Sequence, residues 1–138
     1  MAVSNDPVFA QTPKTAGVAF AAASQSTQMD PGTVAPTTLL TAGANGALVT
    51  SVIVHAEATQ TADKHVLWIQ LLGAGNWYAV KSVVMAAYTQ AATDAQASVT
   101  VIDKLDPNQA VRLAATDVLG VTHHVDLQSM VFAEYMDY

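Results

Sequence analysis

The sequence predicts an all-β protein: an antiparallel β-sandwich or jelly-roll that begins with an extended N-terminal arm. Short segments rich in β-branched and other apolar residues recur along the 138-residue chain, and turn-forming residues separate them at regular spacing. No segment repeats its apolar residues at the 3.6-residue period of a sizeable helix. We therefore expect residues 1–16 to form the arm and residues 17–138 to form a single β-sandwich domain.

The arm is expected to be extended. Pro7 and Pro13 forbid a continuous helix through residues 1–14, because proline lacks a backbone N–H and restricts the residue before it. Val8 and Phe9 lie between the two prolines and offer one apolar anchor. The arm therefore suits a segment that docks onto another surface.

A hairpin is expected at the centre of the fold. Residues 17–23 fit a strand or a short helix, of which we favour the strand, and residues 25–36 read as an exposed loop. Residues 37–59 then predict a strand, a tight turn and a second strand. The turn carries three residues that accept a positive φ: Gly43, Asn45 and Gly46.

The second strand of this hairpin predicts part of the core. Val52, Val54 and Ala56 share one face, because successive side chains on a strand alternate. Val49 is apolar too, but unbroken alternation would place it on the opposite face of the strand. A β-bulge near Thr50 would bring it to the same side.

A second hairpin is expected over residues 65–85. The first strand, HVLWIQLL at 65–72, is apolar on both faces, so its second face needs a cover from this chain or from a neighbour. A turn at 73–76 leads to the partner strand at 77–85. The remaining expected strands are 97–105, 110–114 and one long strand at 121–135, with a helical turn or loop at 88–96 and a turn at 116–120.

The composition points to an uncharged surface. Charged residues make up 12% of the chain and hydrophobic residues 51%, whereas about a quarter of the residues of a typical globular domain are charged. The exterior must therefore be mostly Ala, Thr, Ser, Gln and Asn. Either this uncharged surface simply faces water, or other subunits cover much of it. We favour the second interpretation, because uncharged surface is easier to desolvate.

Several function classes are not expected. The net charge is −6 and Arg112 is the single arginine, which argues against nucleic-acid binding. The absence of cysteine excludes disulfides and thiolate metal sites. The sequence starts without a signal-peptide pattern, and its apolar stretches are shorter than the roughly 20 residues of a membrane span, so we expect a soluble protein made in a cytoplasm.

We expect no catalytic residues, no metal site and no cofactor. His123 and His124 are adjacent on a strand and should point to opposite faces, although His124 shares a face with Asp126. The sequence has neither a G-x-S-x-G nucleophile motif nor a phosphate-binding glycine loop. Trp77 and Tyr78, beside a glycine turn, could be exposed for a subunit contact or a sugar platform.

The chain resembles a family of small structural proteins of tailed bacteriophages that lie on the outside of the head. The resemblance rests on the opening NDPVFAQTPK, on TLLTAGANGALVTSVIVHA, which is similar to a recurrent T-L-x-T-A-G-x-x-G turn and strand, and on the segments HVLWIQLL and DPNQAVRLAA. A terminal strand ending near Asp137 and Tyr138 completes it. It departs where the family often has basic residues after the turn and here has Thr50, Ser51 and Ile53.

The resemblance implies a capsid decoration (cement) protein, with no enzymatic activity, on the exterior of the virion. Its implied partners are the major capsid protein and further copies of itself, as a homotrimer, after synthesis in the host cytoplasm. It implies no partner among nucleic acids or membranes. We expect eight residues to make the capsid or subunit contacts: Pro7, Val8, Phe9, Pro13, Leu67, Ile69, Trp77 and Tyr78.

Three other functions stay open. A tail, neck or fibre-base component would use the same surface properties in fewer copies. A carbohydrate-binding β-sandwich would use Trp77, Tyr78 and nearby acids. A small jelly-roll enzyme would need His55, His123 and His124 as metal ligands.

Overall fold

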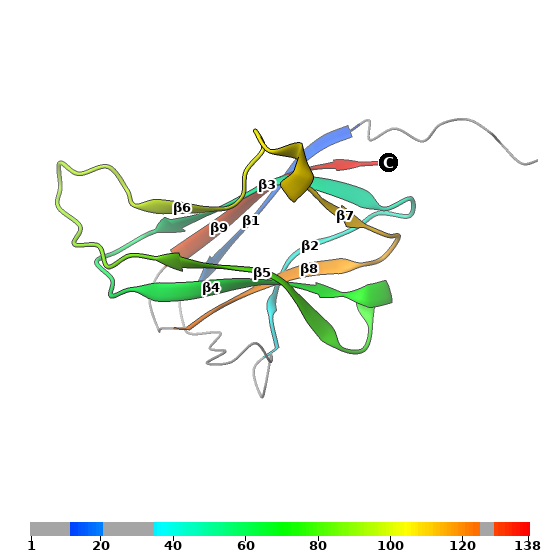
Figure 1. The fold of residues 1–138 in the computed structure, drawn as a ribbon, viewed down its shortest axis with the longest axis horizontal. Helices are drawn as coiled ribbons and strands as arrows, with labels where there is room; N and C mark the ends of the chain where they lie inside the picture. The colour runs from blue at the N-terminus through cyan, green and yellow to red at the C-terminus, as the bar shows by residue number, and fades with distance from the viewer. Residues whose placement is uncertain (1–11, 21–34, 125–128) are drawn as a thin grey trace, which may run out of the picture.

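The chain folds into an all-β sandwich, which confirms the predicted fold class. The computed structural model describes residues 12–20, 35–124 and 129–138. Figure 1 shows the strands in chain order: β1 (Thr12–Phe20), β2 (Thr37–Thr41), β3 (Ala47–Ala56), β4 (Asp63–Gln70), β5 (Trp77–Met85), β6 (Ser98–Ile102), β7 (Val111–Leu113), β8 (Val118–His123) and β9 (Ser129–Asp137). Two 3-10 turns accompany them, η1 (Leu71–Gly73) and η2 (Pro107–Gln109). No helix in the described ranges is long and apolar enough to cross a membrane.

The strands form two antiparallel sheets that enclose the core. The first sheet has the order β1-β9-β3-β6, with β7 also paired to β3. The second sheet has the order β2-β8-β4-β5. In Figure 1 the first sheet occupies the upper half of the molecule and the second sheet the lower half. Apolar side chains from both inner faces meet between them, as expected when two sheets pack face to face.

Strand β3 follows the predicted alternation. Val52, Val54 and Ala56 are buried at 0%, 0% and 1% exposure. The pairing of β3 with β9 shifts by one residue between Val49 and Ser51, and Val49 is fully buried. The predicted bulge is therefore confirmed, and it brings Val49 into the core as the pattern required.

The predicted central hairpin is wrong, because its two strands belong to different sheets. β2 pairs with β8 and β3 pairs with β9, so the turn at 42–46 crosses from the second sheet to the first. Packed sheets lie about 10 Å apart, a gap that a short connection can span. Turn residues identify a change of direction, but they do not determine whether the next strand pairs with its predecessor.

The predicted long strand at 121–135 is also wrong. β8 starts at Val118, within the expected turn, and ends at His123, and β9 starts at Ser129 in the opposite sheet. All six residues of β8 are buried, which follows from its central position between β2 and β4. Ser129, Val131 and Ala133 share a buried face as predicted. Residues 125–128 lie outside the described ranges.

The second hairpin is confirmed, and β4 is covered on both faces by its own chain. β4 and β5 pair antiparallel from Asp63 to Gln70. Val66 and Trp68, on the outer face, are each 1% exposed, and the Trp68 indole N–H donates to Thr122 Oγ1 at 2.8 Å. The cover that this two-sided apolar strand required is therefore intramolecular, and a neighbouring subunit is not needed for it.

The boundary of the predicted arm needs correction. β1 begins at Thr12 and pairs with β9 along its whole length, so residues 12–16 belong to the first sheet. Pro13 lies opposite Met136 on this edge strand, where a missing N–H is tolerated. Residues 1–11 lie outside the described ranges.

Gly120 on β8 should be intolerant of any side chain. A Cβ at this position would lie 2.7 Å from the Trp77 ring and 3.0 Å from Pro36 Cβ. We expect Gly120→Ala to destabilise the protein by about 1–3 kcal/mol through overpacking, measured by urea denaturation.

Gly17→Ala provides the matched control. A Cβ at Gly17 would meet its nearest atom at 3.6 Å, an ordinary contact, so the free energy of unfolding should change by less than about 0.5 kcal/mol. Equal losses in the two variants would contradict the packing argument.

Candidate functional site

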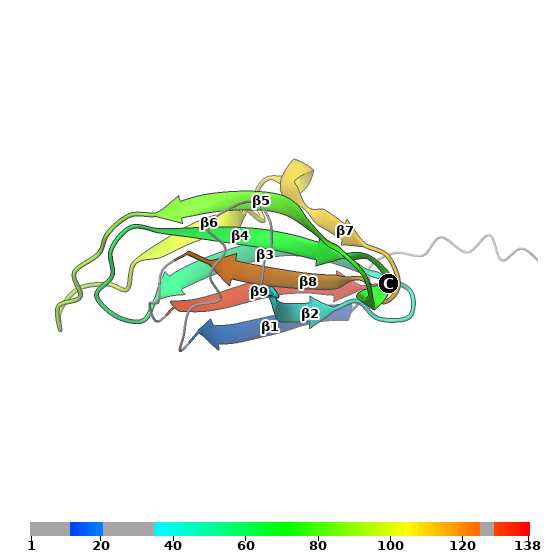
Figure 2. The ribbon, with the colours of Figure 1, turned by 90° about the horizontal axis from the view of Figure 1, so that it is seen from below.

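The sandwich has two ends with different chemistry. At the end where β1 begins, Thr12, Asp137 and Ala47 are neighbours in the first sheet, and Gln70 and Val118 are neighbours in the second. We call this the Asp117 end. Figures 1 and 2 show η1, the turn between β2 and β3 and the C-terminus gathered there.

The buried carboxylate of Asp117 organises this end. Its side chain is part of a residue that is 5% exposed, yet both oxygens are satisfied. Oδ1 accepts the Leu72 backbone N–H and Oδ2 accepts the Ala114 N–H, each at 2.9 Å, while the Asp117 carbonyl accepts the Ala42 N–H at 2.8 Å. One residue thus connects three turns. A buried charge is stable only when it is fully hydrogen-bonded, and these contacts provide the hydrogen bonds.

Two residues of these turns have left-handed backbones. Leu72 has φ 56° and Thr116 has φ 67°. The turns also pack closely, since a Cβ at Gly73 would lie 3.1 Å from the Thr116 carbonyl oxygen. Left-handed geometry is unfavourable for residues with a Cβ, so the surrounding hydrogen bonds must hold it.

Exposed apolar side chains provide the candidate contacts. Leu71 is 50% exposed and Leu72 is 73% exposed, both at the Asp117 end. Among the described residues, the other large hydrophobic side chains with substantial exposure are Tyr78, Val80, Val84, Leu105 and Phe132. The fold therefore leaves apolar surface on both sheets and on η1.

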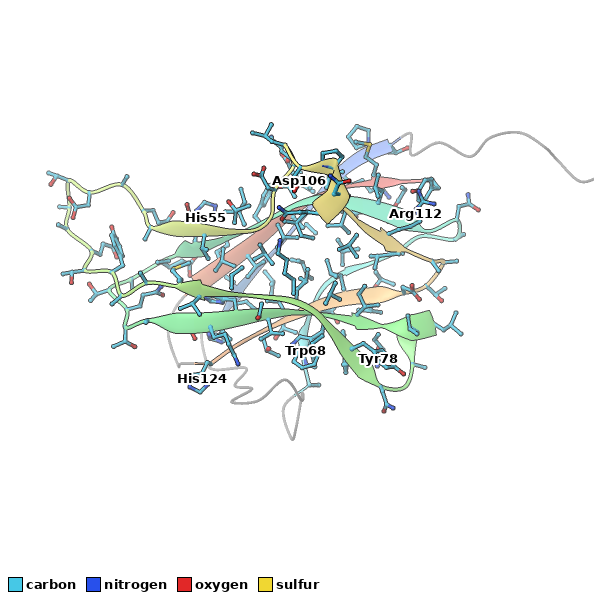
Figure 3. The ribbon with its side chains drawn as sticks, viewed as in Figure 1. His55, Trp68, Tyr78, Asp106, Arg112 and His124 are labelled. Carbon is cyan, nitrogen blue, oxygen red and sulfur yellow. The ribbon has the colours of Figure 1, made fainter. Side chains whose placement is uncertain are left out.

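The structure separates the expected contact residues. Tyr78 is 53% exposed, close to η1, and is available for a contact, as Figure 3 shows. Trp77 is half-buried, with its ring against Gly120. Pro13 is exposed on β1. Pro7, Val8 and Phe9 lie outside the described ranges.

The expected contact role of Leu67 is wrong. It is 1% exposed and belongs to the core between the sheets, and Ile69 is half-buried against that core. Both side chains lie on the inner face of β4, opposite the first sheet, so neither is available to a neighbour.

A groove lies on the first sheet, beside β1. Pro13, Leu105, Tyr135 and Met136 form part of its lining. Its charges are paired: Lys14 forms an ion pair with Asp137, and Lys104 lies 3.4 Å from Glu134 Oε2. The groove therefore combines apolar side chains with ion-paired charges and the hydroxyls of Thr15 and Thr50.

A buried polar cluster lies at the opposite end, which we call the Asp63 end. His123 Nδ1 and His65 Nε2 lie 3.5 and 3.6 Å from Asp63 Oδ2, and all three side chains are fully buried. The two imidazole planes are parallel within 3°, with centroids 6.2 Å apart. Asp63 Oδ1 accepts the backbone N–H of His124 at 2.9 Å, and the Phe20 ring covers His123.

The imidazole of His65 is held neutral. Both of its ring nitrogens are buried without a hydrogen-bond partner among the described residues. Burial lowers the pKa of His65 below its usual 6.5, the Asp63 carboxylate opposes that shift, and His123 lowers the pKa further. Acid must therefore charge a group whose side chain is fully buried.

The histidines considered as metal ligands do not gather. His123 points inward and is 1% exposed, whereas His124 is exposed, as strand alternation predicts. His55 is on β3, in the other sheet, and Figure 3 shows it far from His124. Asp126 lies outside the described ranges. Within those ranges no group of three or more His, Cys, Asp or Glu residues is arranged to hold a metal ion.

Sequence reasoning missed the most distinctive groups at both ends. Asp63 and His65 stand four and two residues before Leu67 on the same strand, so alternation would have placed all three inside. Leu71 and Leu72 were assigned to a strand because they are apolar. The glycines at 73 and 75, both with positive φ, are the signal that the strand had already ended.

Comparisons with known proteins identify the fold and no family. No family model matches the chain, and no curated protein matches its sequence. The solved structure of Eiger TNF from S. frugiperda is similar over 93% of this chain and 94% of that one, with a TM-score of 0.50 and 12% sequence identity. At this identity the likeness extends to the jelly-roll sandwich alone.

Replacing the Asp117 carboxylate should destabilise the fold. In Asp117→Asn, either the Leu72 or the Ala114 N–H would face an amide donor in place of an acceptor. We expect a loss of about 1–3 kcal/mol in the free energy of unfolding, measured by urea denaturation. Asp94→Asn, in an exposed loop, should change it by less than about 0.5 kcal/mol. A tolerated Asp117→Asn would contradict the organising role.

Acidification should destabilise the protein through His65. Because its folded pKa is lowered, the unfolded chain binds the proton first as pH falls below about 6.5, and stability declines from there towards the folded pKa. We expect His65→Gln to lose less unfolding free energy than the wild type between about pH 7 and about pH 5. His124→Gln, at an exposed position, should retain the wild-type decline. Parallel pH profiles for wild type and His65→Gln would contradict this expectation.

Proposed function

We propose that this chain is a bacteriophage virion structural protein, a capsid decoration protein that binds the outside of the head and stabilises contacts between major capsid subunits. It acts there as a homotrimer, and its function requires no catalytic residue. Its site of action is the exterior of the virion, after synthesis in the host cytoplasm.

The surface is the observation that carries this proposal. Only 12% of the residues are charged, and surface lysines are engaged within the chain: Lys14 with Asp137, and Lys104 with Glu134. Apolar side chains are exposed at η1, on β5 and on β9. A surface of this kind loses little hydration energy when other subunits cover it.

Part of the low charge content has an intramolecular cause. The outer face of β4 is covered by its own chain, so two-sided apolar strands are no longer an argument for a neighbour. Two observations still support the proposal: the exposed apolar side chains, and the resemblance of the turn and strand segments to phage head proteins. The jelly-roll occurs in viral capsid proteins and also in lectins, so the fold is compatible with the proposal without selecting it.

Attachment at symmetric positions would make weak single contacts sufficient. A trimer that engages three equivalent capsid sites gains affinity through effective concentration, without any new kind of contact. A tail, neck or fibre-base component would share the surface chemistry but would occur in few copies. Counting copies in purified particles separates these locations, since a head protein is present in hundreds.

The carbohydrate-binding alternative gains no support from the aromatic residues. Tyr78 is exposed, but the Trp77 ring packs against Gly120, so the two do not offer a shared platform. A sugar-binding site requires aromatic faces open to the ligand. We therefore retain the head protein as the function that the surface supports best.

Deleting residues 2–11 should abolish binding to the shell. The deletion stops before Thr12, because β1 begins there and residues 12–16 pair with β9. We expect the truncated protein to keep its thermal midpoint and to lose co-sedimentation with empty shells assembled from the major capsid protein of the same phage.

The full-length protein is the positive control in that assay. Co-sedimentation of the full-length chain, and its loss after truncation, would support both the function and the role of the arm. Undiminished binding of the truncated protein would overturn the role of the arm. Failure of the full-length chain to bind shells would overturn the proposed function.

A further inference from the structure

The outer face of the first sheet is more apolar than an exposed sheet face normally is. The inner residues of β9, Val131 and Ala133, belong to the core. The alternate side chains Met130, Phe132 and Met136 therefore point outward. An antiparallel sheet that faces water on one side usually carries polar residues there. Phe132 is nevertheless 36% exposed, so an aromatic ring lies in solvent on this sheet.

Strand pairing extends the apolar surface across the sheet. Directly paired residues point to the same side, so Phe132 lies between Gly17 of β1 and Ile53 of β3. The next row of paired residues has its methionine in the same place, and β6 adds one residue to each row. We call these two rows the β9 face, and they are Gly17, Phe132, Ile53 and Thr100 in one, and Ala19, Met130, His55 and Ser98 in the other.

The β9 face is flat and carries no Asp, Glu, Lys or Arg. The Phe132 ring lies beside Gly17, where an added Cβ would meet its Cδ2 at 3.7 Å. The ion pair of Lys104 with Glu134 belongs to the same sheet but lies outside the two rows. His55 marks the position of the face in Figure 3. The face therefore offers a partner apolar area bordered by short polar side chains.

We propose that the β9 face is the contact between copies of this chain, where one subunit packs against another in the homotrimer. This inference rests on the proposed function and identifies the surface through which the subunits meet. Permanent interfaces between identical subunits are more apolar than transient ones and resemble a domain core, and the side chains of Phe132, Ile53 and Met130 have that chemistry.

The charge distribution favours a second copy as the occupant. Each chain carries a net charge of −6, so copies repel one another wherever their acidic groups meet. The β9 face is a surface where copies can approach with little repulsion, whereas a partner recognised by opposite charge would find no acidic or basic side chain on it. The described acidic residues are buried, ion-paired or in connections between strands: Asp63 and Asp117; Glu134 and Asp137; and Glu57, Asp94, Asp103 and Asp106.

The extent of the sheet also suits a contact between subunits. β9 has nine residues and the sheet is four strands across, which gives an outline of about 30 Å by about 15–20 Å. Protruding side chains raise the accessible area of this outline towards the roughly 800 Å² that each partner buries in a stable interface. A contact with the shell would leave the face in water until docking, whereas a contact between copies covers it once the subunits assemble.

The test places a lysine on the β9 face and a matched lysine on the second sheet. Phe132→Lys and Thr100→Lys put an ionic group into the contact, where burial without a partner is costly. Thr100 is exposed on β6 and is not part of the core, so its substitution leaves the fold intact. Val84→Lys introduces the same charge at a 63% exposed position on β5. General repulsion between copies falls equally in all three variants, because each gains one positive charge.

Sedimentation equilibrium gives the masses. We expect the wild type and Val84→Lys to have three times the 14.4 kDa mass of one chain. Phe132→Lys and Thr100→Lys should keep the wild-type circular dichroism and dissociate to monomers at concentrations about tenfold or more higher than the wild type does. If Phe132→Lys does not fold, Thr100→Lys decides the result alone.

The outcomes separate the contact from the proposed function. Dissociation of the β9-face variants, with the trimer retained in Val84→Lys, would support the contact. A wild-type oligomer that survives the substitutions, or a wild type that is a monomer, would overturn it. Variants that keep the oligomer but lose co-sedimentation with major-capsid-protein shells would assign the face to the shell, which also overturns it. Failure of the wild type to bind those shells would remove the decoration function, while the masses alone would still decide the contact.

Discussion

The carboxylate of Asp117 is the interaction on which one end of the molecule depends. It is removed from water, and it is stabilised because two backbone N–H groups from different turns converge on its oxygens. Its own carbonyl binds the turn that crosses between the sheets. The same contacts that satisfy a buried charge therefore fix the connection between the sheets and the orientation of η1.

The strands were predictable where local periodicity determines them. In β3 the alternation of Val52 and Val54, and the out-of-step Val49, were sufficient to place the core face and the bulge. Pairing was not predictable in the same way. The turn at 42–46 looks like a hairpin turn, yet β2 pairs with β8 and β3 with β9, so the two strands lie in different sheets and contribute to one core from opposite sides. Strands that are consecutive in sequence are the first choice as pairing partners, but burial against distant segments decides the actual pairing.

The candidate site was less predictable than the fold. Leu71 and Leu72 continue an apolar run, and in the sequence only the glycines at 73 and 75 signal that they leave the sheet. Leu67 was misassigned because a strand that is apolar on both faces gives no sign of which face another layer covers. His65 and Asp63 obey alternation, but polarity at the start of a strand suggests solvent. Their burial follows from the pairing of His65 with His123, which joins distant segments.

The burial of β4 on both faces has a consequence for how the domain opens. β4 is flanked by β5 and β8, and both of its faces are buried along Val66, Leu67 and Trp68. Its amide protons can exchange with solvent only when neighbouring strands separate, so their exchange reports global unfolding. The edge strand β1, by contrast, is exposed along most of its length and can fray without disturbing the centre. The molecule thus combines a central strand, β4, that opens only with the whole domain and an edge strand, β1, that can open separately.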